Sequence, residues 1–364
     1  MKKIIFKKFN FNTSKFFLTT LLIFGVIVWT LQAVNYFDYV TEDGHGLITY
    51  FKFTALNFPK ILNRLVPFVF FISLFYMIIS YELRNELNIF WINGVTKIEF
   101  LNNIISFSIF LMIFQLILGA YISPNSQLKS REYLKNSNID FFTALIKPGK
   151  FINVVKDLTI FINEGNSDGT FNNIFIEDTR VGSRIIFAKK GVIINSEDNK
   201  RFVLFNGKIV NNDNSTNIFD FQQIDINLKN INSKTIITPK IQEISSTYLL
   251  KCKISFYKNI NLNNCNKMLS KDIRQELFKR IIKPIYIPVI AIICSYLIIK
   301  SASSKTYNKN KYQIFFFAFI FLVFSEVSVK YSSSSDNLLL IFTLFPMLIF
   351  IISYFIFLKK IKYA

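Results

Sequence analysis

Long apolar runs and short alternating segments divide the chain into two kinds of sequence. Six runs are long and apolar enough to cross, as helices, a hydrocarbon layer of about 30 Å. They are Phe16–Val34, Ile61–Tyr81, Phe100–Ile122, Ile285–Ile299, Ile314–Val329 and Leu338–Leu358. The pattern predicts a membrane protein with three helices before, and three helices after, a long central segment.

The central segment contains short apolar stretches separated by turn residues. Alternation is clearest near its end, where Ile224, Ile226 and Leu228 would face one way and Asp225 and Asn227 the other. A period of two is typical of strands with one buried face. Many short strands with Gly-rich and Asn-rich turns between them predict a sandwich or jelly roll. Residues 271–283 then read as an amphipathic helix that leads into the fourth run.

These patterns predict three parts. Residues 1–123 hold the first three transmembrane helices, 124–280 an inserted all-β, jelly-roll-like domain with a connecting helix, and 281–364 the last three helices. Lys and Arg are concentrated before residue 16, in the loops after the second and fourth runs, and in the tail. Because cytoplasmic loops carry the excess of basic residues, both termini are predicted to be cytoplasmic and the β-domain to lie outside.

The chain has a net charge of +20, and 51% of its residues are hydrophobic. In a soluble protein that charge would suggest nucleic acid, but here much of the lysine flanks membrane runs. The chain has no phosphate-binding loop, no HExxH and no GxSxG, and its one histidine, His45, lies in a Gly-flanked loop. We therefore expect no enzymatic activity, no cofactor and no metal, so any transport work would draw on a partner.

Three cysteines are too few for a disulfide scaffold or a metal cluster. Cys294 lies in an apolar run and is interpreted as a packing residue. Cys252 and Cys265 both fall in the predicted exported domain, where an oxidising compartment would permit a disulfide. Spacing alone leaves that bond open.

The loop at about 82–97 is short, charged and amphipathic. Leu87, Phe90 and Trp91 fall at helical spacing, Gly94 can end a helix and Thr96 can cap the next one. Such a helix can transmit motion from a soluble partner to two membrane spans. It can equally be a simple turn resting in the membrane interface, where Trp91 is well suited.

Glu86, Leu87 and Gly94, within NELNIFWING, resemble the S-E-L-x-x-x-x-A-x-G signature of the LptF/LptG permeases of lipopolysaccharide export. Asn85 and Ile92 stand where Ser and a small residue are usual. Further stretches that resemble the family follow in its order: FPKILNRLVP, YISPNS, PGKF, LTIFINE, NNIFIED and QELFKRIIKP. Within the family, PGKF and NNIFIED look more like LptF than LptG.

The resemblance implies an inner-membrane permease subunit that works with an LptG-like permease, a dimer of an LptB-like ATPase and an LptC-like periplasmic protein. Lipopolysaccharide would enter laterally, and ATP-driven cavity collapse would expel it into the periplasmic jelly roll. The ATPase would dock on Glu86, Leu87, Phe90, Trp91 and Gly94. Whether the chain pairs with a second permease or with itself stays open.

Basic residues near the outer helix ends are candidates for the lipid headgroup: Lys52, Lys60, Arg64 and Lys330. Arg64 is the most informative, because an Arg among apolar residues needs an anion or water. The alternative is that these side chains snorkel to the interface. Glu326 and Lys330, four residues apart, predict a local helix pair rather than a ligand site.

A second hypothesis is a membrane-anchored scaffold whose β-domain only recruits partners. The two hypotheses differ at the coupling loop, since a scaffold does not need Glu86 or Gly94.

Overall fold

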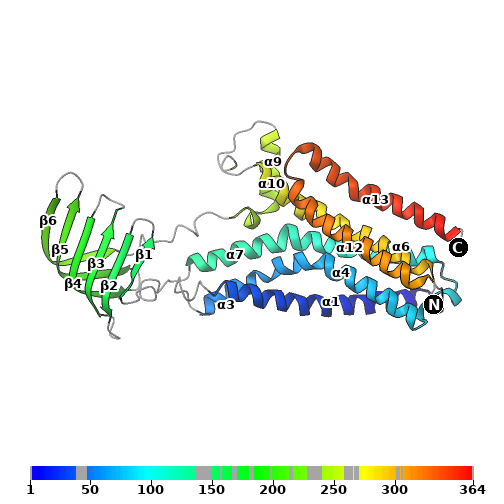
Figure 1. The fold of residues 1–364 in the computed structure, drawn as a ribbon, viewed down its shortest axis with the longest axis horizontal. Coiled ribbons are helices and arrows are strands. Elements are labelled where there is room, and N and C mark those ends of the chain that lie inside the picture. Colours follow the sequence, from blue (N-terminus) through cyan, green and yellow to red (C-terminus); the bar gives the residue numbers. More distant parts are fainter. Residues whose placement is uncertain are drawn as a thin grey trace. The chain divides into compact units, whose positions relative to one another are not determined.

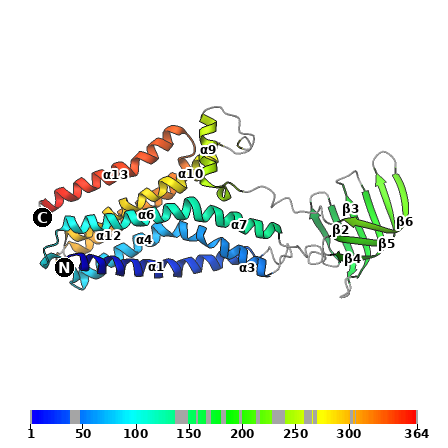
Figure 2. The ribbon, with the colours of Figure 1, turned by 180° about the vertical axis from the view of Figure 1, so that it is seen from behind.

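Helices make up most of the chain on either side of a single group of strands (Figures 1 and 2). The computed structural model describes residues 2–37, 47–136, 149–155, 158–165, 170–179, 184–196, 199–212, 216–227, 240–257, 265, 270–300, 304 and 306–362. Before the strands lie α1 (Lys2–Asn35), α3 (Leu47–Leu56), α4 (Phe58–Leu83), α5 (Glu86–Ile92), α6 (Lys97–Ile117), the π-helical turn η1 (Leu118–Ile122) and α7 (Ser123–Asn136). After them come η3 (Ile241–Glu243), α9 (Ser246–Tyr257), α10 (Ser270–Leu277), the π-helical turn η4 (Phe278–Ile282), η5 (Lys283–Ile285), α11 (Tyr286–Ser295), η6 (Tyr296–Ile299), α12 (Tyr307–Tyr331) and α13 (Asp336–Lys362).

Six helical stretches are long and apolar enough to cross a membrane. They are Lys2–Asn35, Leu47–Leu83, Lys97–Leu134, Ser270–Ile299, Tyr307–Tyr331 and Asp336–Lys362. Each predicted apolar run lies inside one of them, so the six-helix prediction is confirmed. The predicted helix at 271–283 is also present, as α10 and η4 in continuous helical passage to α11.

The centre of the helical bundle is α11. It packs against α4, α6, α12 and α13, and its Ile287, Val289 and Ile290 are fully buried. Of the 18 residues that form the apolar segment of the stretch containing α11, 72% are buried. The corresponding shares are 17% for α1 and 6% for α13. The helix is apolar on every side because it is surrounded, whereas α1 and α13 direct most of their apolar surface outwards.

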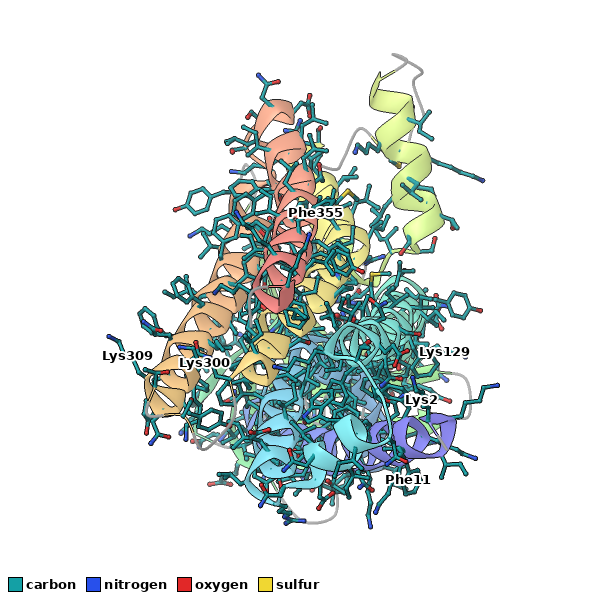
Figure 3. The ribbon with its side chains drawn as sticks, turned by 90° about the vertical axis from the view of Figure 1, so that its right-hand side faces the viewer. Lys2, Phe11, Lys129, Lys300, Lys309 and Phe355 are labelled. Atoms are coloured by element: carbon teal, nitrogen blue, oxygen red, sulfur yellow. A yellow bond between two sulfur atoms is a disulfide. The ribbon has the colours of Figure 1, made fainter. Side chains whose placement is uncertain are left out.

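Both termini lie at the same end of this bundle (Figure 1). Figure 3 looks at the molecule from that end, where Lys2 lies on α1, Lys300 directly after η6 and Lys309 on α12. Phe11 on α1 and Phe355 on α13 are 67% and 65% exposed, on surfaces that a bilayer or another helix would cover.

The strands form one antiparallel sheet in the sequential order β1-β2-β3-β4-β5-β6. Their bounds are Phe151–Val155, Leu158–Gly165, Thr170–Asp178, Arg184–Ser196, Asn199–Asn212 and Thr216–Asn227. The prediction of an all-β domain inserted between the helices is confirmed, and the six described strands follow one another as a meander. The alternation at the end of the segment is also correct, because Ile224 and Ile226 pack on the sheet core while Asp225 is exposed. Leu228 lies outside the described residues.

One face of the sheet forms a core of its own, which includes Ile160, Ile176, Ile186 and Phe202. On β3 and β5 the positions that point to this core change parity at Asn173 and Asn206. Both asparagines have positive φ, 51° and 52°, a conformation that Asn tolerates better than most residues. The opposite face carries a row of neighbouring rings, Phe151, Phe161, Phe175 and Phe187.

By its contacts the chain separates into two compact units, residues 1–32, 55–130 and 240–364 in the first and residues 33–54 and 131–239 in the second. The first contains the helical bundle with α9 and α10, and the second contains the sheet. Residues 240–257 and 270–280 therefore pack with the membrane helices rather than with the strands.

Candidate functional site

The short helix α5 is defined at both ends by its local sequence. Asn85 precedes it in the left-handed region with φ 57°, and Gly94 follows it with φ 72°. The Val95 N–H donates to the Phe90 carbonyl at 3.0 Å, which completes the turn that the Gly94 conformation permits. Thr96 and Glu99 then form a reciprocal capping box at the start of α6. The predicted helix end at Gly94 and cap at Thr96 are both confirmed.

An aromatic cluster fixes the inner face of α5. Leu87 and Phe90 are each 1% exposed, and the Phe90 ring lies 5.6 Å from the Phe6 ring and 5.1 Å from the Phe100 ring. Trp91 adds a contact with Phe100 at 5.9 Å. Since Phe6 belongs to α1 and Phe100 to α6, a displacement of α5 would push directly on two membrane helices.

The outer face of α5 is apolar and uncovered in this chain. Ile89 and Ile92 are 50% and 84% exposed, and Leu83 just before the helix is 64% exposed. Glu86 sits beside this surface, half-exposed, with its carboxylate 3.9 Å from the Arg84 guanidinium. This geometry suits a docking surface with an apolar centre and a charge at its rim.

The four basic residues predicted for a headgroup are divided between the two units of the chain. Lys52 lies over the Tyr133 ring at 5.4 Å, in the unit that contains the sheet. Lys60 and Arg64 lie one turn apart on α4, and Lys330 is exposed near the end of α12. Arg64 is also exposed, and it has no ion pair or hydrogen bond within the described part of the chain.

Arg64 lines a cavity of about 720 Å³ between α4, α10, η4 and α12. Its charged lining residues are Arg64, Lys240, Asp272, Glu276, Lys279, Lys283 and Glu326. Sequence reasoning selected only Arg64 among the four basic members. Lys279 and Lys283 are four residues apart just before the fourth apolar run, so they fall on the same face of a helix. That spacing could have predicted a basic surface at this cavity.

Ion pairs inside the helical unit occupy several of these charges. Lys279 lies 3.2 Å from Glu276, whose carboxylate also pairs with Arg280 at 2.9 Å. Lys283, which is 5% exposed, pairs with Glu326 of α12. The predicted local pair of Glu326 with Lys330 is therefore wrong: the Glu326 carboxylate turns to a buried lysine on the neighbouring helix, where removal from water strengthens the attraction.

Cys252 and Cys265 are joined by a disulfide, and both are buried. They lie in a small apolar core with Leu249, Ile273 and Leu277, which packs α9 against α10. Cys294 is buried at the bundle centre without a sulfur partner, as its position in an apolar run predicted.

The fold and these sites define a polytopic membrane protein with an inserted β-sheet domain and an exposed apolar helix between two of its spans. A model of the family "Lipopolysaccharide export system permease LptF/LptG" matches residues 9–360, which is nearly the whole chain. The chain belongs to this family, and it is a multi-pass inner-membrane component of lipopolysaccharide export. It is also similar to the uncharacterized protein RP871 of Rickettsia prowazekii (strain Madrid E), with 22% identity over 264 residues, 71% of this chain and 72% of that protein.

Proposed function

We propose that this chain is the permease subunit that extracts lipopolysaccharide from the inner membrane while a separate ATPase supplies the energy. The lipid enters laterally between helices, and closure of the helices expels it towards the β-domain. The chain works with an LptG-like permease, two copies of an LptB-like ATPase and an LptC-like periplasmic protein. Within the family we assign it to the LptF type.

The observation that carries this proposal is the two-sided construction of α5. Its inner face is locked by Leu87 and Phe90 into the aromatic cluster, and its outer face exposes Ile89 and Ile92. The inner face of α5 is packed against α1 and α6, and its outer apolar face is exposed. A soluble partner can bind the outer face, and a movement of that partner would then displace α1 and α6.

Orientation is supported by the position of the lysines. Lys2, Lys300 and Lys309 surround the end of the bundle that holds both termini. Under the positive-inside rule this end is cytoplasmic, which places α5 within reach of a cytoplasmic ATPase. The same assignment puts the β-domain in the periplasm.

We propose that the lipid headgroup contacts Arg64, because this exposed residue lines the charged cavity. Lys60 lies on the same helix, and it lines a small neighbouring pocket together with Arg64, Lys279 and Arg280. A phosphate on the lipid would find several cationic side chains there.

The test is co-purification from the native membrane with mass spectrometry of the bound proteins and lipid. The central variant is Ile92→Asp, which places a charge on the exposed face of α5 without touching the buried face. Its matched control is Ile218→Asp, because Ile218 is a comparably exposed isoleucine on β6.

We expect the wild type and Ile218→Asp to retain an ABC ATPase, a second permease and lipopolysaccharide, and Ile92→Asp to lose the ATPase. Glu86→Gln is expected to weaken the ATPase contact less, because a rim charge contributes less than a buried apolar centre. Recovery of the wild type without any ATPase, in a detergent that preserves such complexes, would refute the transporter assignment and leave a membrane-anchored scaffold.

A further inference from the structure

Two of the membrane stretches change from α to π geometry shortly before a proline. The turn η1 (Leu118–Ile122) precedes Pro124, and η4 (Phe278–Ile282) precedes Pro284. Proline has no N–H, so the carbonyls four residues earlier, those of Ala120 and Arg280, cannot accept their ordinary α-helical hydrogen bond. Each break is therefore a place where the helix can bend and where a main-chain carbonyl needs another donor.

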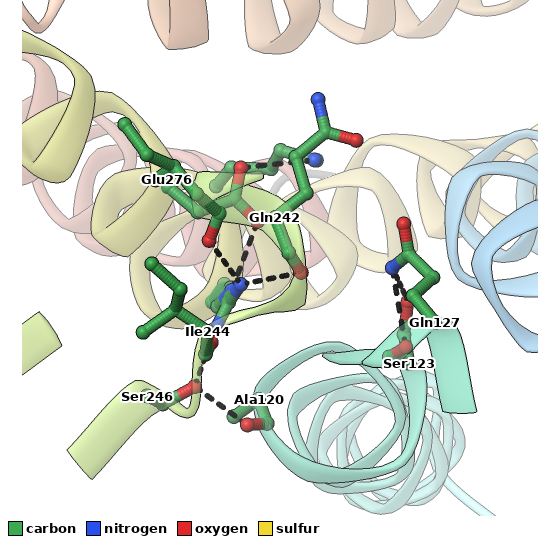
Figure 4. Close-up of polar contacts among 10 residues, drawn as sticks. Ala120, Ser123, Gln127, Gln242, Ile244, Ser246 and Glu276 are labelled. Carbon is green, nitrogen blue, oxygen red and sulfur yellow. Dashed lines mark hydrogen bonds and ion pairs between the residues drawn. The ribbon is translucent and has the colours of Figure 1, made fainter. Parts of the chain in front are cut away.

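One serine connects the two breaks. The Ser246 hydroxyl donates to the Ala120 carbonyl at 2.5 Å and accepts from Arg280 Nη1 at 2.9 Å (Figure 4). Ser246 is the first residue of α9, which follows the sheet in the chain. The hydroxyl thereby supplies the donor that Pro124 lacks and joins η1 to η4.

Arg280 fixes the chain segment that returns from the sheet. Its side chain is buried, and besides Ser246 it donates to the carbonyls of Ile244 at 2.8 Å, Gln242 at 2.9 Å and Ile241 at 3.4 Å. Nε donates to Glu276 at 2.9 Å, which balances the buried charge. All the nitrogens of the guanidinium are used, in a planar arrangement that lysine cannot reproduce.

We propose that Ala120, Ser246, Glu276 and Arg280 form a polar clasp that carries movement of the membrane helices to both ends of the inserted β-domain segment. The chain enters that segment through η1 and α7 and returns from it through residues 240–246, and both paths meet at the clasp. Because the two helix breaks are tied to each other, they bend together rather than independently. Ser246 and Arg280 are positioning residues: they keep the breaks in register while the helices close.

This inference rests on the proposed function, because the movement it transmits is the ATP-driven closure. Its first test uses the whole transporter complex in lipid nanodiscs, loaded with lipopolysaccharide. ATP hydrolysis and ATP-dependent transfer of lipid to a periplasmic acceptor protein are measured side by side. The variants are Ser246→Ala and Arg280→Lys, and the matched control is Thr247→Ala, the neighbouring exposed hydroxyl.

We expect Ser246→Ala to keep hydrolysis within about twofold of the wild type and to lower transfer by about tenfold, consistent with loss of a charge-assisted hydrogen bond. Arg280→Lys should lower transfer further, and Thr247→Ala should change neither rate. Equal losses of hydrolysis and transfer in Ser246→Ala would show a merely structural role and overturn the clasp. Wild-type transfer rates in both clasp variants would overturn it as well.

A second measurement does not depend on transport. Amide hydrogen exchange of the purified chain reports opening at residues 117–124 and 278–284. The clasp predicts that Ser246→Ala raises exchange in both stretches together, whereas Thr247→Ala leaves both unchanged. A rise confined to residues 246–250 would refute it. If the wild-type complex shows no ATP-dependent transfer, the proposed function fails while the exchange result still decides whether the two breaks are coupled.

Discussion

The two ends of the helical bundle are held by opposite kinds of interaction. At the α5 end, Phe90 and Phe100 are held by ring packing, for which more than one offset or edge-to-face arrangement is favourable. At the other end, Arg280 is fixed by hydrogen bonds that each require a specific partner atom. Apolar packing tolerates small shifts and substitutions of similar volume, whereas a buried guanidinium tolerates neither. A helix that must receive a push and a junction that must hold its alignment need these different properties.

The largest effect expected from this difference is at Arg280. Arg280→Met leaves three carbonyls without their donor and leaves the buried Glu276 carboxylate with Lys279 alone, so the unfolding free energy should fall by about 3–5 kcal/mol. The measurement is denaturant unfolding in mixed micelles. Lys2→Met is the comparison, because Lys2 and its partner Glu99 are both about half exposed, and it should cost less than about 1 kcal/mol. Equal losses for the two variants would contradict the special status of Arg280.

The aromatic end should respond to size more than to chemistry. Phe90→Ala opens a cavity among Phe6, Phe9 and Phe100 and should lower the unfolding free energy by about 3 kcal/mol. Phe90→Leu retains most of the apolar volume and should cost less than about 1.5 kcal/mol. The same unfolding experiment measures both. If Phe90→Leu proved as costly as Phe90→Ala, ring geometry rather than volume would hold α5.

The disulfide between α9 and the following loop supports the clasp from one side. Replacing both Cys252 and Cys265 with serine releases a closure of 13 residues and should lower the unfolding free energy by about 2–3 kcal/mol. Calorimetry with and without a reductant checks this, since reductant should shift the midpoint of the wild type but not of the double variant. An unchanged wild-type midpoint under full reduction would show that the small core of Leu249 and Ile273 suffices.

The smallest effect expected is at Gly94. Its φ of 72° is unfavourable for a residue with a Cβ, while no atom lies within 4 Å of the position a Cβ would take. Gly94→Ala should therefore cost about 1 kcal/mol through the backbone alone. Thermal unfolding gives the cost, and ATPase binding shows whether α5 has changed its presentation. A loss of binding far beyond the stability change would mean that Gly94 itself touches the partner.

Much of the architecture was predictable because it depends on local pattern. The six apolar runs and the alternation at Ile224 and Ile226 specify helices and strands through periodicities that need no tertiary context. Gly94 and Thr96 likewise predicted the end of α5 and the start of α6. The connectivity of the strands, which determines the meander, was not visible in the same way.

The polar contacts were less predictable because their partners are far apart in sequence. Pro124 and Pro284 lie beside the two π-helical turns, but nothing local identified Ser246 as the donor to the Ala120 carbonyl. Glu326 illustrates the same limit, since helical spacing favoured Lys330 and the packing of α12 against η5 provided Lys283. The cavity at Arg64 was also missed, because it is assembled from four separate parts of the chain.

The sequence separation within the clasp has a consequence for biosynthesis. Ser246 is made 126 residues after Ala120, which at ordinary elongation rates of about 5–20 residues per second is a delay of roughly 10 s. During that interval the first three helices are already synthesised, but the Ala120 carbonyl lacks its hydroxyl donor because Ser246 has not yet been synthesised. The two halves of the bundle can be locked together only after the β-domain segment has been made, so the clasp closes late and would act as a checkpoint on assembly.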